Sequence, residues 1–158
     1  MRSRTAIWFE CKIRYEKVME DGLQKKVTEA YSVDALSYSE AEKRIIEEIS
    51  SYISGEFEVA TITKAPYKEV FFADGEMADR FYRVKLDFIT IDENTEKEKR
   101  SRVTYLVQAG SLNGAMKAVD EVMSGTMIDY DAAAITDTKL MDVFEYGKSD
   151  KEEYDAEG

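Results

Sequence analysis

Two stretches of this sequence resemble each other closely enough to constrain the fold before anything else is considered. Residues 30–53 align with residues 104–127 at a constant offset of 74. Flanking segments align at an offset of 73, where Trp8-Phe9 matches Phe81-Tyr82 and Ile62-Thr63 matches Ile135-Thr136. A repeat of this length indicates a duplicated structural unit. The chain is therefore expected to contain two halves with the same order of elements.

Each half begins with the pattern of a β-hairpin. Residues 5–18 alternate between apolar and polar side chains, which is typical of a half-buried strand. Glu20-Asp21-Gly22 is a turn signal, and residues 26–33 supply the returning strand. In the second half, residues 80–91 and 103–109 predict the matching pair of strands, with the turn at residues 92–95.

A helix is expected after each hairpin. Ser37 with Glu40 forms a capping box at the start of the first helix, and Ser111 is the matching cap of the second. Apolar residues then recur every three or four positions, which predicts one buried stripe on each helix. Residues 56–64 and 67–73 predict strands in the first half, as do residues 128–136 and 140–146 in the second.

These elements predict an α+β protein made of two pseudo-symmetric ββαβ repeats, about 5–73 and 79–146, within a single domain at residues 1–146. We expect an antiparallel sheet, with both helices on one face and a core shared by the two halves. The pattern leaves open whether the repeats form one continuous sheet or two packed sheets. The acidic segment 147–158 is expected to be a disordered tail.

The composition indicates the cellular compartment in which the protein is expected. Cys11 is the single cysteine, which excludes an internal disulfide, and no apolar stretch is long enough to span a bilayer. Charged residues interrupt the N-terminus too early for a secretory signal. We therefore predict a cytoplasmic protein.

Few residues in this chain are suited to catalysis. It contains no histidine, the usual general base near neutral pH, and Cys11 lies in the predicted inner row of a strand. Acidic pairs such as Asp129 and Asp131 lack the spacing of a calcium loop and are interpreted as surface carboxylates. No nucleotide-binding or nucleophile motif is present. We predict a non-enzymatic protein with no cofactor and no metal site.

The outward rows of the two hairpins carry the candidate binding residues. Seven cations and four acids are predicted to point outward from these four strands, with one large aromatic ring on each hairpin. Rings among cations on an open sheet suit single-stranded nucleic acid, because bases stack on the rings while Lys and Arg contact phosphates. The predicted site residues are Trp8, Lys12, Arg14, Lys26, Phe81, Arg83, Lys85, Arg100 and Arg102.

Other functions fit the same pattern. Trp8 and Phe81 could instead pack against a partner protein or a second copy, since exposed aromatic side chains often mark protein contacts. The broader alternative is therefore a protein-interaction or homo-oligomerisation module. Capture of a small molecule between the halves also stays open. No interaction with a membrane is expected.

The segments WFECKIRYEKV, FITIDENTEKEKR and YLVQAGSLNGAMKAVDEVMSGTMIDY resemble the family called domain of unknown function 4494. The resemblance extends to about Tyr146. It implies a small intracellular accessory protein of Bacteroidetes bacteria or their phages, and it implies no activity, cofactor or site residue. The order of elements is also loosely similar to that of the PUR and Whirly single-strand-binding proteins, a likeness of fold that does not determine function.

Overall fold

The computed structural model describes residues 1–75 and 77–147 of the chain, which form two compact units. Unit 1 contains Met1–Thr5 and Pro66–Lys139. Unit 2 contains Ala6–Ala65 and the described residues from Leu140 onward. Each unit has its own sheet, its own helix and its own cluster of buried apolar side chains.

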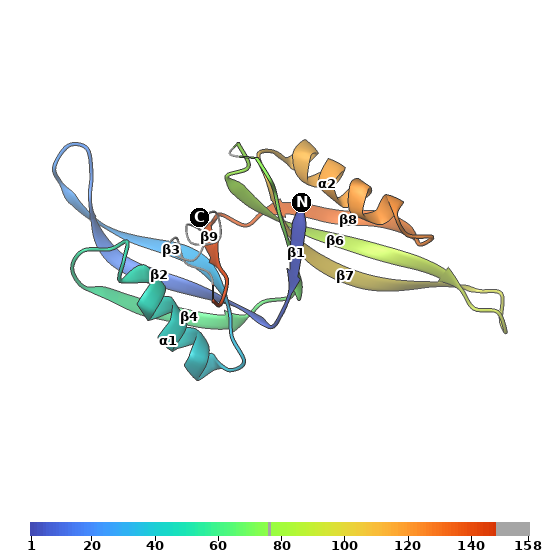
Figure 1. Cartoon of the computed structure of the whole chain (residues 1–158), viewed down its shortest axis with the longest axis horizontal. Helices are drawn as coiled ribbons and strands as arrows, with labels where there is room; N and C mark the ends of the chain where they lie inside the picture. The colour runs from blue at the N-terminus through green and yellow to red at the C-terminus, as the bar shows by residue number, and fades with distance from the viewer. Residues whose placement is uncertain (76, 148–158) are drawn as a thin grey trace, which may run out of the picture. The chain divides into compact units, whose positions relative to one another are not determined.

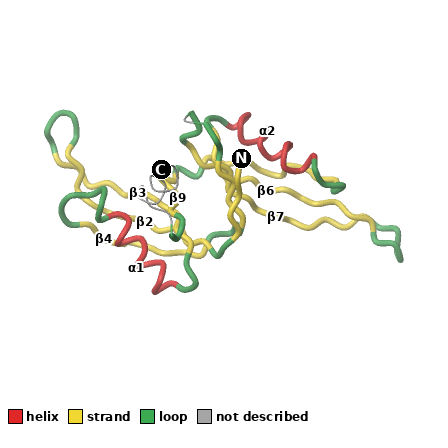
Figure 2. The backbone as a smooth tube through the Cα atoms, in the orientation of Figure 1, coloured by secondary structure: helices red, strands yellow, loops and turns green. Residues whose placement is uncertain are grey.

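Unit 2 is built on a long hairpin. Strands β2 (Trp8–Val18) and β3 (Gln24–Asp34) pair antiparallel along their whole length, and Gly22 takes the positive φ of 83° that the turn requires. Strand β4 (Phe57–Lys64) pairs with β2, and β9 (Leu140–Phe144) pairs parallel with β3. The order in the sheet is β4-β2-β3-β9. Figure 2 shows the loop of this hairpin at its far end.

Helix α1 (Tyr38–Ile49) packs against the sheet of unit 2 through its apolar stripe. Its cap forms as the sequence predicts: the Ser37 hydroxyl accepts a hydrogen bond from the Glu40 amide, and the Glu40 carboxylate accepts one from the Leu36 amide. Figure 1 shows α1 alongside β2 and β4. The fully buried Ile45 and Ile49 of α1 meet the inner row of the hairpin, including Cys11 and Ile13.

Unit 1 has the same core arrangement with one additional strand. Strands β6 (Arg80–Ile91) and β7 (Glu98–Ala109) form the hairpin, β8 (Asp129–Asp137) pairs with β6, and β5 (Glu69–Phe72) pairs parallel with β7. The short strand β1 (Arg2–Thr5) is antiparallel to β5. The order in the sheet is β1-β5-β7-β6-β8.

Helix α2 (Leu112–Ser124) covers the sheet of unit 1. The Ser111 hydroxyl accepts a hydrogen bond from the Gly114 amide, but no glutamate at position 114 completes a capping box. The chain turns tightly before this cap: a Cβ added to Gly110 would lie 2.7 Å from the Met77 carbonyl oxygen. Ala115, Val119 and Met123 of α2 are buried against the inner row of the hairpin.

Strands β5 and β9 are exchanged between the two units. Strand β5 follows β4 in the chain but pairs with β7 in unit 1, whereas β9 follows β8 but pairs with β3 in unit 2. The two strands hold matching places, with Val70 opposite Leu106 and Val143 opposite Ser32. Each sheet is therefore completed by a strand from the other half of the sequence.

The α+β class predicted from the sequence is confirmed, and several details differ. The sheets are mixed and not purely antiparallel, because β5 and β9 pair parallel with their neighbours. Of the two arrangements left open by the sequence, the structure has two sheets, and each sheet is covered by its own helix. The two core clusters lie in separate units, where one shared core was expected. Of the predicted tail 147–158, residues 148–158 lie outside the described part of the chain.

Candidate binding surfaces

The two aromatic rings predicted to stand exposed are buried. The Trp8 side chain is 1% exposed and Phe81 is 4% exposed. Both residues lie on the face of their strands opposite the helix, as the alternation predicts, because Phe9 and Tyr82 beside them belong to the helix-facing cores. The prediction of an open aromatic platform is wrong. Burial prevents both rings from stacking on a ligand.

Trp8 lies beside a buried polar cluster in unit 2. In the β2–β3 register it faces Asp34, which is 5% exposed. The Arg44 guanidinium of α1 reaches this carboxylate, with Nη1 2.9 Å from Oδ1 of Asp34 and 2.8 Å from its carbonyl oxygen. The Tyr146 amide donates to the same Oδ1 at 2.8 Å, and the Tyr146 ring lies against the guanidinium. This cluster joins α1, the end of β3 and the segment after β9.

The cations predicted on the hairpin of unit 2 are exposed, but they are accompanied by acids. Lys12, Arg14 and Lys26 all reach solvent. Nη1 of Arg14 lies 3.8 Å from Oε2 of Glu58 on the neighbouring strand β4. The outward rows of β2, β3 and β4 carry these three cations and also four acids among the described residues: Glu10, Glu16, Asp34 and Glu58. The prediction of a net positive face is wrong for unit 2.

In unit 1 the predicted cations Arg83 and Lys85 are half-buried, whereas Arg100 and Arg102 are exposed. Arg102 donates two hydrogen bonds to Asp87, at 2.9 and 3.3 Å. This interaction lowers the pKa of the Asp87 carboxyl, against the opposing effect of desolvation. Nη1 of Arg100 lies 3.0 Å from Oδ2 of Asp131 on β8.

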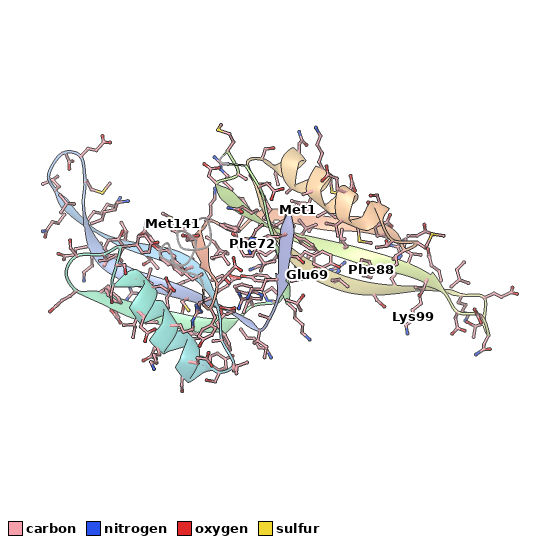
Figure 3. The ribbon with its side chains drawn as sticks, in the orientation of Figure 1. Met1, Glu69, Phe72, Phe88, Lys99 and Met141 are labelled. Atoms are coloured by element: carbon pink, nitrogen blue, oxygen red, sulfur yellow. The ribbon has the colours of Figure 1, made fainter. Side chains whose placement is uncertain are left out.

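The outward rows of β6, β7 and β8 balance in charge. The four described cations, Arg83, Lys85, Arg100 and Arg102, are matched by four acids, Asp87, Glu98, Asp129 and Asp131. Two of those acids, Asp129 and Asp131, belong to β8, which lies outside the β6–β7 hairpin. Figure 3 places Lys99, next to Arg100, toward the far end of the β6–β7 hairpin. Of the predicted basic residues, Arg14, Arg100 and Arg102 therefore lie in ion pairs with acids on neighbouring strands.

A hollow lies at the far end of the unit 2 hairpin and contains two of the predicted site residues. It has a volume of about 560 Å³ and brings Arg14 and Lys26 together with Glu16, Glu56 and Glu58. The carboxylates outnumber the cations around it, so the hollow does not favour a polyanion.

Both units expose a long edge strand that the sequence interpretation did not single out. Among the described strands, β4 pairs only with β2, and β8 pairs only with β6. Proteins usually protect such edges with charged residues or proline. Here the centres of both strands are uncharged, at residues 59–63 and 132–136. The two uncharged runs are visible in the sequence. Only the order of strands in each sheet shows that these runs lie on edge strands.

A groove accompanies the edge of β4. It lies between α1 and β4, has a volume of about 360 Å³, and is lined by Tyr38, Ser39, Glu42, Val59, Ala60, Thr61 and Ile62. The Tyr38 ring packs edge-on against Phe9, with ring centroids 4.9 Å apart. One wall of the groove is therefore anchored on the core of unit 2.

Cys11 is a buried thiol in the core of unit 2. Burial, with a smaller effect from the charge of Glu10, raises the pKa of the Cys11 thiol to about 12. Among residues 1–75 and 77–147, no group of three or more His, Cys, Asp or Glu side chains is placed to hold a metal ion. No helix in the same part of the chain has the length and apolar character to cross a membrane.

Comparison with known families identifies the chain. The model of the family "Domain of unknown function (DUF4494)" matches residues 7–146. The chain belongs to the DUF4494 family. The match to DUF4494 spans both edge strands and the Asp34, Arg44 and Tyr146 cluster. No curated protein and no solved structure is significantly similar to the chain.

Proposed function

We propose that this DUF4494 protein is a non-enzymatic binding protein whose partner is another protein chain. The observation that carries the proposal is the pair of long edge strands, β4 and β8, with uncharged centres. Exposed strand edges of this kind are templates for pairing with a further chain.

Single-stranded nucleic acid is the competing ligand, and the side-chain arrangement favours it less. Base stacking needs accessible rings, whereas Trp8 and Phe81 are buried. Phosphate binding draws on cations without nearby acids, whereas Arg100 and Arg102 lie within ion-pair distance of Asp131 and Asp87. A net charge of −11 adds a general repulsion of polyanions.

The absence of catalysis is part of the proposal and rests on chemistry. Cys11 is buried and its raised pKa keeps the thiol protonated near neutral pH, so it is a poor nucleophile. The chain has no histidine to activate it. We place the protein in the cytoplasm, as an accessory factor of Bacteroidetes or their phages, on the basis of its single cysteine and the family resemblance.

Site-specific photocrosslinking in the native host tests the proposal. A photoreactive benzophenone side chain is placed on the edges at Thr61 or Ala133, and at the exposed Lys117 of α2 as the control. We expect the edge positions to give crosslinked adducts and the control position to give few. Protease should remove these adducts, and nuclease should leave them intact. Adducts removed by nuclease, or equal yields at all three positions, would contradict a protein partner.

A further inference from the structure

We propose that the free edge of β4 and helix α1 together bind an extended, basic segment of a partner protein, which adds to the sheet of unit 2 as a further strand. This inference rests on the proposed function and names the surface and the kind of partner.

The register of β4 identifies the backbone groups that face outward. The Ala65 amide donates to the Trp8 carbonyl at 2.8 Å, so these two residues form a hydrogen-bonded antiparallel pair. Such pairs recur at every second residue. Thr61 and Thr63 therefore direct their backbone groups toward β2, while Ile62 and Lys64 direct theirs to the open edge. An added strand has donors and acceptors available at Ile62 and Lys64.

A bulge limits the length of the edge that can pair. The β2–β4 register shifts between Lys12 and Ile13, which leaves Ala60 as the extra residue in β4. Bulges disturb pairing locally. The regular stretch therefore runs from Thr61 to Lys64, and an added strand is short.

Helix α1 supplies the side wall of the site. Tyr38, Glu42 and Ile46 follow each other at intervals of four residues and therefore form one line along the helix. Tyr38 is 55% exposed and Ile46 is 38% exposed, so the line presents apolar surface on both sides of a carboxylate. Every second side chain of a strand added to β4 would point into this groove.

In unit 1 a hydrogen bond ties the helix to the edge strand, one helical turn beyond the position that matches Glu42. There the Tyr130 hydroxyl of β8 donates to Asp120 of α2 at 2.6 Å, which joins the helix to the edge strand. The repeat alignment places Phe57 and Ile46 at these two positions in unit 2. Neither side chain can form that bond. The opening between helix and edge strand is therefore assigned to β4 of unit 2.

The negative charge at the groove and of the whole chain favours a basic partner segment. Glu42 is the charged side chain among those that line the groove. The net charge of −11 steers cations toward the molecule and acidic segments away from it. The partner segment is therefore expected to alternate apolar residues with Lys or Arg.

Peptide selection on the full-length protein tests the inference. Phage-displayed random dodecapeptides are selected on the immobilised chain, and the enriched sequence is synthesised with a fluorescent label. We expect a period-two pattern of apolar and basic residues. Binding should also slow hydrogen exchange at the Ile62 and Lys64 amides. An acidic, helical or absent consensus would overturn the inference.

Two variants and a control then locate the bound peptide. Glu42→Lys should weaken binding about tenfold, because it places a like charge in the groove. Lys64→Pro should weaken it similarly, because proline removes an outward amide. Glu47→Lys makes the same charge change at another exposed position of α1 and should alter affinity less than about twofold. Circular dichroism checks the fold of each variant, and Glu42→Lys suffices if Lys64→Pro does not fold.

The outcomes separate this inference from the proposed function. A peptide that binds Glu42→Lys as tightly as the wild type lies elsewhere, which overturns the β4 site and leaves a protein partner in place. Binding of an unstructured oligonucleotide with no peptide selected would overturn both.

Discussion

The guanidinium of Arg44 and the carboxylate of Asp34 form a buried ion pair, with Nη1 2.9 Å from Oδ1. Both side chains are less than 10% exposed. The pair links the middle of α1 to the end of β3, and the Tyr146 amide donates to the same carboxylate oxygen. A buried pair is most informative when one partner is removed, because the other charge is then left uncompensated.

We therefore expect Arg44→Ala to lower the free energy of unfolding by about 3–5 kcal/mol. Lys43→Ala, on the exposed side of the same helix, should change it by less than about 0.5 kcal/mol. Urea denaturation followed by circular dichroism measures both. Equal stability of the two variants would show that the ion pair contributes little.

Removal of β9 should destabilise unit 2 in particular. A chain that ends at Lys139 lacks Phe144, whose ring stacks on Tyr31 with centroids 5.7 Å apart, and it leaves β3 without its parallel partner. The Cys11 thiol, with its pKa raised to about 12 by burial, reports the change. A thiol reagent at neutral pH should react slowly with the full chain and rapidly with the truncated one.

A chain ending at Gly147 keeps β9 and is the control. If both truncated chains stay protected, β9 is dispensable for unit 2.

Gly110→Ala should destabilise unit 1, because the new Cβ would lie 2.7 Å from the Met77 carbonyl oxygen. We expect a loss of about 1–3 kcal/mol in unfolding free energy. Gly125→Ala is the matched control, since its Cβ would meet the nearest atom at 3.9 Å and its φ of −78° suits alanine. The melting temperatures of the two variants, measured side by side, test the difference. An unchanged melting temperature for Gly110→Ala would mean that the loop at Met77 yields easily.

Asp87 should contribute to the stability of unit 1 in a pH-dependent way. The hydrogen bonds from Arg102 lower the pKa of its carboxyl below the ordinary value of 3.8. A group whose pKa is lowered by folding stabilises the folded state at pH values above its unfolded pKa. This contribution is lost as the pH falls through the lowered, folded value.

The prediction is that Asp87→Asn loses stability at neutral pH and has a flatter stability curve in acid than the wild type. Melting temperatures measured from neutral pH to below the ordinary pKa of aspartate give the two curves. Asp92→Asn, at the exposed turn of the same hairpin, is the comparison. Parallel curves for wild type and Asp87→Asn would refute the coupling to Arg102.

Trp8 should behave as a buried fluorophore. Its indole is 1% exposed, so its emission should be blue-shifted and iodide should quench it only weakly until the chain is denatured. Single-stranded oligonucleotides at low salt should leave the emission unchanged. Strong, salt-sensitive quenching by an oligonucleotide would restore the nucleic-acid hypothesis and remove support for the protein partner.

Local signals account for the parts of the fold that were predicted correctly. The caps at Ser37 and Ser111 and the turn at Gly22 depend on residues a few positions apart. Both hairpins follow from alternation within single strands. Each of these features is stabilised by neighbours in the chain, so the sequence pattern contains the relevant interactions.

The candidate site was predicted less well, because its properties depend on partners distant in the sequence. Alternation places Trp8 opposite the helix face, but it cannot report whether that face is exposed. The net charge of the outward rows depends on Glu58 and Asp131, which come from strands placed beside the hairpins by tertiary pairing. Arg44 lies on a helix of ordinary amphipathic pattern, and only the fold brings it to Asp34.

The amino-acid sequence alone therefore determined the α+β class, the two hairpins and the two capped helices, since short-range periodicity and capping encode them. The tertiary structure decided the exchange of β5 and β9, the burial of Trp8 and Phe81, and the identity of β4 and β8 as edges. Those features arise from hydrogen bonds and packing between segments tens of residues apart, where many alternative pairings satisfy the same local pattern.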